Sequence, residues 1–181
     1  LFMKRSLLIR LHLYAAAFLS PAFLFVAVSG GLYLVGVKGS VEQTVVGVPS
    51  QLALDPSSES LYEDVQKVLL AAGISHDFQY VKVKGKTLLT RPTSRNFYKF
   101  DMQPEGLVVS YNEPSMQNKL IELHKGHGPE LFKTFQKVIA VGLLFVVLSG
   151  FWLGVSALGL RRNTLILTGS GAILFVLLAL L

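Results

Sequence analysis

The sequence has no cysteine among its 181 residues. Without a thiol, the chain can build neither a disulfide framework nor a thiolate metal site. Carboxylates are missing from its long apolar runs, because all eleven acidic residues lie between Glu42 and Glu130. The sequence also lacks a phosphate-binding loop and a nucleotide fingerprint, and no Ser-His-Asp order in it is convincing as a catalytic triad. These absences favour a protein that is not itself an enzyme.

Apolar residues, in contrast, are abundant. They make up 51% of the sequence, and the mean hydropathy of +0.52 exceeds that of ordinary soluble domains. The excess is concentrated in three runs: Leu11 to Val37, Val138 to Leu160 and Thr164 to Leu181. A helix of about 20 residues crosses a hydrocarbon core about 30 Å thick. The sequence therefore predicts three transmembrane helices.

The first run has a rival interpretation as a secretory signal peptide. Such a peptide has an apolar region of about 7 to 15 residues and then a small-x-small cleavage site. This run is longer, and no such site follows cleanly, so a membrane helix is favoured. The chain opens on Leu1 instead of Met, and its third run ends at Leu181 without a polar flank. We expect the sequence to be part of a longer gene product.

Basic residues predict the orientation. Lys4, Arg5 and Arg10 precede the first run, and Arg161-Arg162 separates the second from the third. Short basic segments stay in the cytoplasm, whereas a long loop is translocated largely regardless of its charge. We expect a bacterial inner membrane protein with a cytoplasmic N-terminus, and with residues 38–134 in the periplasm or, more generally, outside the cytoplasm. These five cations account for most of the net charge of +6, so a nucleic-acid partner is not indicated.

The predicted fold class is a membrane α-helical protein with three transmembrane helices and an inserted small α+β domain. The predicted boundaries follow the runs. They are residues 1–37 for the cytoplasmic N-terminus and first helix, 38–134 for the outer domain, 135–160 for the second helix, 161–163 for a cytoplasmic turn and 164–181 for the third helix.

Within the outer domain, one helix is expected to precede the strands. A linker is predicted from Pro49 to Ser60, and Ser60 with Glu63 matches a capping box at the helix start. Apolar residues then recur at helical spacing up to Ala72, and Gly73 is a plausible stop. After this helix the apolar period changes to two. About four antiparallel strands are predicted, near residues 81–84, 87–90, 96–101 and 107–111.

A seven-residue pattern occurs twice, once in each of the first two runs. Leu-Phe-Val-Ala-Val-Ser-Gly ends at Gly30, and Leu-Phe-Val-Val-Leu-Ser-Gly ends at Gly150. One soluble segment separates the two runs, so their helices cross the membrane in opposite senses. Each copy has histidine upstream: His12 before the first, and His124 and His127 before the second. Helix, histidine and Ser-Gly therefore form a unit repeated with inverted topology.

These motifs carry a family resemblance. The hairpin from Phe97 to Val109 resembles the closing hairpin of a PepSY domain, and the flanking helices resemble the PepSY-associated transmembrane family. The matching segments are Arg10-Leu11-His12, Leu123-His124-Lys125-Gly126 and the two Ser-Gly pairs, which stand where that family has a Thr-Gly-like motif. The resemblance implies a link to iron handling and siderophore reduction.

The three histidines are the candidate haem or metal ligands. An ionisable side chain inside a membrane helix is costly and is treated by default as functional, and neutral imidazole is a common ligand of haem iron. For His12 the alternative is interfacial anchoring beside Arg10. His124 and His127 are spaced to share a metal if their segment is helical, but Gly126 and Gly128 favour a loop over the membrane surface.

The predicted topology separates the histidines. His12 lies near the inner face and His124 near the outer, so both cannot ligate one haem. Ligation by two histidines would then require a second subunit or a partner protein, and the inverted repeat permits one site in each leaflet.

Small residues predict close helix packing. Gly150 and Gly154 form a small-xxx-small motif within the second run, and Gly30 adds a further small position in the first. A cofactor pocket also requires small neighbours, so these glycines are compatible with either packing or binding.

Two functions follow from the sequence. In the first, the protein is an accessory or scaffold subunit of a larger membrane assembly, and its outer domain docks a membrane or periplasmic partner. In the alternative, it is a transmembrane electron-transfer protein that binds haem b and is linked to iron or siderophore reduction.

Overall fold

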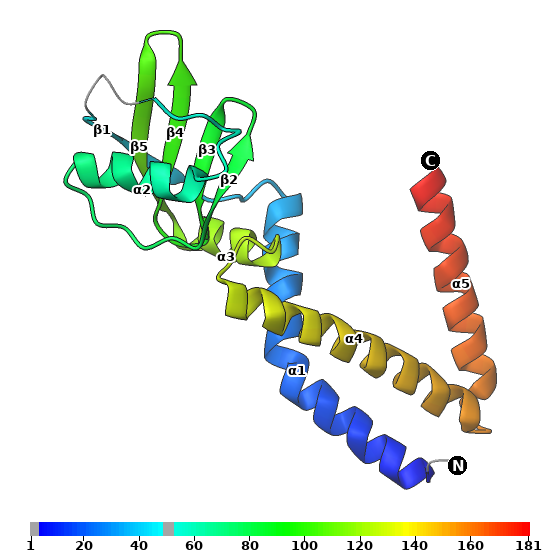
Figure 1. Cartoon of the computed structure of the whole chain (residues 1–181). Coiled ribbons are helices and arrows are strands. Elements are labelled where there is room, and N and C mark those ends of the chain that lie inside the picture. The colour runs from blue at the N-terminus through cyan, green and yellow to red at the C-terminus, as the bar shows by residue number, and fades with distance from the viewer. Residues whose placement is uncertain (1–3, 49–52) are drawn as a thin grey trace. The chain divides into compact units, whose positions relative to one another are not determined.

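The computed structural model describes residues 4–48 and 53–181. Figure 1 shows helices and a single antiparallel sheet in the described residues. In chain order the elements are α1 (Arg5–Leu34), β1 (Val41–Val46), α2 (Leu61–Ala71), β2 (Tyr80–Lys84), β3 (Thr87–Arg91), β4 (Phe97–Gln103), β5 (Gly106–Pro114), α3 (Met116–His124), α4 (Glu130–Ser156) and α5 (Arg161–Leu180).

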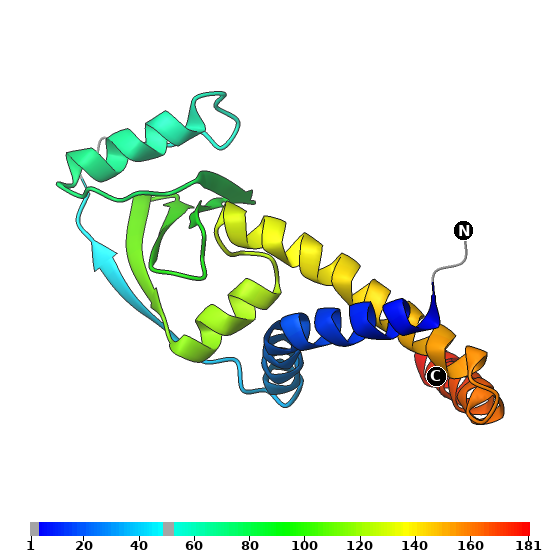
Figure 2. The same cartoon turned by 90° about the horizontal axis from the view of Figure 1, so that it is seen from below.

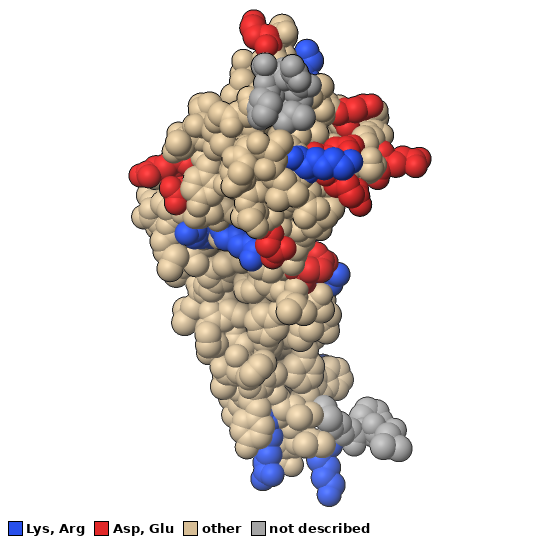
Figure 3. Space-filling model, turned by 60° about the vertical axis from the view of Figure 1, so that its left-hand side comes forward, with Lys and Arg blue, Asp and Glu red and all other residues tan. Residues whose placement is uncertain are grey.

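Three of these helices, α1, α4 and α5, are long and apolar enough to cross a membrane by length and composition. They correspond to the three apolar runs, which confirms that part of the sequence prediction. All three begin earlier than their runs, because α1 starts at Arg5, α4 at Glu130 and α5 at Arg161. The turn predicted at residues 161–163 is therefore wrong, since the turn between α4 and α5 lies at residues 157–160. Figure 3 shows a broad uncharged surface over the helical part, while charged side chains gather over the part that carries the sheet.

The chain divides into two compact units. One consists of Leu1–Phe23 and Lys137–Leu181, and the other consists of Leu24–Gln136. Both α1 and α4 contribute to each unit, since the divisions fall inside these helices. The second unit contains the sheet, α2 and α3, so it holds the whole α+β domain.

The sheet has five strands in the order β1-β5-β4-β3-β2, and every neighbouring pair is antiparallel. Side chains alternate between its two faces along each strand. On one face, Leu88, Phe100 and Val109 are fully buried and pack with Val65 and Leu69 of α2. Figure 2 shows α2 on this side of the sheet and α3 on the opposite side.

The expected sheet of about four strands, covered by one helix, needs two corrections. Strand β1 is an additional edge strand that pairs with β5 from Val41↔Pro114 to Val46↔Val109. Most of its side chains are exposed, so its sequence lacks the alternation that identified the other strands. Helix α3 is also additional, since a loop was expected before the second apolar run. The helix ends at His124, so Gly126, with its positive φ of 77°, lies beyond the helix and does not weaken it.

The predicted C-terminal end of α2 is confirmed, whereas the predicted cap at its N-terminal end is not. Gly73 follows the C-cap with φ of 73°, which confirms it as the stop. The capping box is wrong, because the Ser60 side chain makes no cap hydrogen bond. Its hydroxyl instead donates to the carboxylate of Asp64 at 3.1 Å. Part of the predicted linker, residues 49–52, lies outside the described residues.

Candidate functional site

In the first unit, His12 of α1 contacts Ser149 of α4. The imidazole Nδ1 and the serine Oγ are 2.8 Å apart, and the two residues are separated by 137 positions in the chain. Ser149 is 6% exposed, although it lies on a helix whose residues are mostly exposed and apolar. This contact is therefore a polar interaction between two apolar helices, α1 and α4.

The serine fixes the tautomer of the histidine. Ser149 Oγ donates its single hydrogen to the carbonyl oxygen of Phe145, at 2.6 Å. A hydroxyl has one hydrogen and two lone pairs, so toward His12 it acts as an acceptor. His12 Nδ1 consequently carries a hydrogen and donates it to Ser149. In the neutral imidazole this leaves the lone pair on Nε2.

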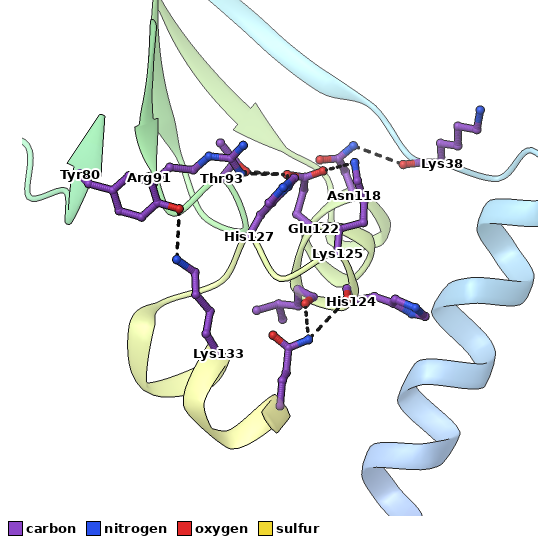
Figure 4. Close-up of polar contacts among 12 residues, drawn as sticks. Lys38, Tyr80, Arg91, Thr93, Asn118, Glu122, His124, Lys125, His127 and Lys133 are labelled. Atoms are coloured by element: carbon purple, nitrogen blue, oxygen red, sulfur yellow. Dashed lines mark hydrogen bonds and ion pairs between the residues drawn. The ribbon is translucent and has the colours of Figure 1, made fainter. Parts of the chain in front are cut away.

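In the second unit, His124 and Ser29 repeat this arrangement. His124 Nδ1 lies 2.8 Å from Ser29 Oγ, and Ser29 Oγ donates to the carbonyl oxygen of Phe25 at 2.7 Å. Ser29 is 1% exposed. Figure 4 shows the His124 side chain directed toward α1. By the same reasoning His124 donates from Nδ1 and keeps the Nε2 lone pair.

The glycine after each serine makes room for the imidazole. A Cβ atom at Gly150 would lie 3.2 Å from Cε1 of His12, and a Cβ atom at Gly30 would lie 3.2 Å from Cε1 of His124. Any side chain at either position would therefore press on the ring. The two residues of the repeated Ser-Gly pair thus have different roles. The serine orients a histidine from another helix, and the glycine leaves space for the imidazole of that histidine.

The third predicted packing glycine contacts a different element. A Cβ atom at Gly154 would lie 2.6 Å from Oγ1 of Thr164 in α5, whereas one at Gly159 would meet nothing within 4 Å. Gly150 and Gly154 therefore face separate neighbours, His12 and Thr164. The small-xxx-small spacing brings two helices close to α4, one at each glycine.

An apolar cavity lies beside His124. Its volume is about 280 Å³. Its lining includes Ser29, Gly30 and Tyr33 from α1, and Ile121 and His124 from α3. The imidazole of His124 thus borders open space as well as its serine.

His127 belongs to a different cluster, centred on Glu122 (Figure 4). Its Nδ1 donates to Oε2 of Glu122 at 2.7 Å. The same oxygen accepts from Thr93 Oγ1 at 2.6 Å, and Arg91 Nη1 lies 3.6 Å away. Lys125 Nζ donates to the other oxygen at 2.7 Å. We refer to these five residues as the Glu122 cluster.

The Glu122 carboxylate is strongly held in its ionised form. Burial by itself would raise its pKa, but hydrogen bonds from Lys125, Thr93 and His127 outweigh that effect. The pKa of Glu122 is lowered from 4.5 to about 2. The carboxylate is therefore charged throughout the physiological range.

The three predicted ligand histidines have different hydrogen-bond partners. His12 and His124 each meet a serine, while His127 meets a carboxylate. The sequence pattern identified the histidines and the Ser-Gly repeat, but it missed the pairing between them. It also missed Arg91, Thr93 and Glu122. The spacing of Glu122 and Lys125 by three residues on one helix was the available signal for that cluster.

Comparison with known protein families identifies one match. The model of the family described as PepSY_TM-like matches residues 9–181, which is nearly the whole chain. Comparisons with curated proteins and with solved structures give no match.

Proposed function

Because the chain belongs to the PepSY_TM-like family of membrane proteins, we propose that it binds haem b through His12 and His124 and serves in electron transfer linked to iron or siderophore reduction. The observation that supports this proposal is the duplicated contact of a histidine with a Ser-Gly pair. In each copy the serine accepts from Nδ1, so Nε2 is available to a metal.

The residues present fit such a group. Ligand histidines are commonly held by a hydrogen bond from the second ring nitrogen, which fixes both tautomer and orientation. Ser149 and Ser29 provide that bond, at 2.8 Å in each case. Gly150 and Gly30 place no side chain against Cε1 of these rings, where a Cβ atom would lie at 3.2 Å. When bound, haem iron would accept and release one electron.

The proposal also gives a reason for an assembly. In the described part of the chain, each Ser-Gly pair receives one histidine. Ligation of an iron by two imidazoles would take the second from another copy of this chain or from a partner protein. The accessory-subunit function predicted from the sequence is therefore compatible with haem binding, with the partner completing the coordination.

The visible spectrum of the purified protein tests the proposal. We expect protein from haem-replete cells to show a Soret band and, after reduction, sharp α and β bands at close to stoichiometric haem. A colourless protein with neither haem nor metal near stoichiometry would end the ligand proposal for His12, His124 and His127. It would leave the accessory-subunit function as the remaining proposal.

The orientation is a further part of this proposal. The N-terminus and Arg161-Arg162, at the start of α5, would be cytoplasmic in a bacterial inner membrane, and the α+β domain would lie on the outer side. The support comes from the basic residues at these positions and from the confinement of acidic residues to Glu42 through Glu130. The two histidine sites would then serve opposite leaflets.

Reporter fusions test this orientation. An alkaline phosphatase fused after Lys38 should be active, because the enzyme folds only outside the cytoplasm, and one fused after Arg162 should be inactive. Fluorescent-protein fusions at the same two positions provide the opposite readout and control for expression. The reverse pattern would overturn both the orientation and the assignment of each histidine to a leaflet.

A further inference from the structure

The face of the sheet opposite α2 is polar. On β3, Leu88 and Thr90 are fully buried on the α2 side, so the alternation places Thr87, Leu89 and Arg91 on the other side. Lys84 pairs with Thr87 across the strands and therefore shares this second face. Helix α3 lies on the same side (Figure 2).

A pocket of about 270 Å³ lies between this face and α3. Four of its lining residues can carry positive charge: Lys84, Arg91, Lys125 and His127. Its lining contains one carboxylate, that of Glu122, which already accepts three hydrogen bonds. The pocket therefore has an excess of positive charge even when His127 is neutral.

Arg91 has an unused donor at this pocket. The residue is 8% exposed, and its Nη1 donates to Thr93 Oγ1 at 2.6 Å. Within the described residues its buried Nε has no hydrogen-bond partner. A buried donor without a partner carries a free-energy cost, so the Arg91 guanidinium, which lines the pocket, is a group that an additional acceptor would stabilise.

We propose that this pocket binds a small carboxylate-bearing anion. The planar guanidinium of Arg91 matches the two oxygens of a carboxylate, and Lys84 adds a second cation to the lining of the pocket. Leu89 and Phe97 also line the pocket, and they offer apolar contact to the carbon skeleton that a carboxylate carries and inorganic phosphate lacks. The proposal is independent of haem binding.

Calorimetric titration of the full chain in detergent tests this assignment, with succinate and inorganic phosphate as probes at fixed ionic strength. Succinate should bind saturably and more tightly than phosphate. Lys84→Met should weaken succinate binding about fivefold to tenfold, because one charge-assisted contact is lost. Lys84 is exposed on edge strand β2, so the variant should fold, and an unchanged thermal unfolding midpoint verifies this.

Lys67→Met is the matched control, because it removes the same charge from α2, on the other face of the sheet. Its side chain is 73% exposed, and succinate binding should be unchanged. Equal weakening by the two variants would overturn the proposal, as would absence of saturable binding of any carboxylate probe. Phosphate binding as tight as that of succinate would also overturn it.

A peptide probe distinguishes the two sources of the carboxylate. A short peptide with a free C-terminal carboxylate that binds more tightly than succinate, and loses this affinity on amidation, would identify a peptide ligand. Tighter binding of succinate than of either peptide would identify a free organic acid. Both results support a carboxylate site. Equal binding of the free and amidated peptides, in the absence of succinate binding, contradicts it.

Discussion

Replacing His12 with alanine is expected to remove about half of the haem carried by the purified protein. His12 would ligate one of two sites through Nε2, and alanine offers no replacement ligand. Alanine suits a helix, and the surrounding run stays apolar, so membrane insertion should continue. His124→Ala should remove the other half. The measurement is haem per chain, by absorption of the pyridine complex, together with the reduced spectrum of each variant.

The serine variants separate ligation from simple packing. Ser149→Ala leaves the His12 ring in place but deprives its Nδ1–H of the acceptor now at 2.8 Å. Loss of such an orienting partner typically weakens metal binding about 10-fold to 100-fold. We expect haem to be retained less firmly and its reduction potential to shift. A role limited to helix packing would change the yield of folded protein without changing the spectrum of the haem that remains.

His127→Asn is the matched histidine control. Its imidazole donates to Glu122 rather than to a serine, so the variant should leave both haem signals unchanged. If His127→Asn instead removed the same signal as His124→Ala, the two histidines would act as a pair, and the assignment of His124 alone to the second site would be wrong.

The pairing in this site could not be predicted from local sequence. The Ser-Gly repeat and the upstream histidines are visible as patterns, and in the structure His12 and His124 contact different serines. The partners, however, are 137 and 95 positions apart. No periodicity links residues on different helices. Each copy of the sequence repeat supplies a histidine to the Ser-Gly pair of the other copy: His12 contacts Ser149, and His124 contacts Ser29. This exchange can be seen only in the packed structure.

The α+β domain was more predictable where its side chains are buried. Strands β3 to β5 and helix α2 have one face in the core, so burial imposes a period of two or 3.6 on their sequences. Edge strand β2 was found from its alternating valines and lysines, although only Val81 of this strand packs against the core. Strand β1 lies at an edge with most side chains exposed, so burial imposes no such pattern on it. Helix α3 has only Ile121 buried, and it was missed for the same reason.

The second large effect is expected from the Glu122 cluster. Glu122→Ala should lower the free energy of unfolding of the domain by about 3 kcal/mol, because it leaves the buried guanidinium of Arg91 without its carboxylate. Thr93 and His127 would also lose their acceptor. Hydrogen exchange of the full chain in detergent measures the effect, since protection of the β3 and α3 amides should fall most.

Acidification provides an independent measure of the same interaction. The pKa of Glu122 is about 2 in the folded protein, against an ordinary value of 4.5. Between these values the unfolded chain binds a proton that the folded chain does not. The stabilisation is therefore fully present above about pH 4.5 and is lost as the pH falls toward 2, with an upper limit of about 3 kcal/mol. Glu122→Gln should remove this part of the acid dependence.

Glu105→Gln is the control for both measurements. Glu105 lies in the exposed turn between β4 and β5, and substitutions at such positions usually change stability by less than about 0.5 kcal/mol. Its acid dependence should match that of the unmodified protein. If Glu122→Gln retained the full loss of stability between pH 4.5 and 2, other carboxylates would be responsible. The contacts of Glu122 with Thr93 and Arg91 would then not be the main stabilising interaction between α3 and the sheet.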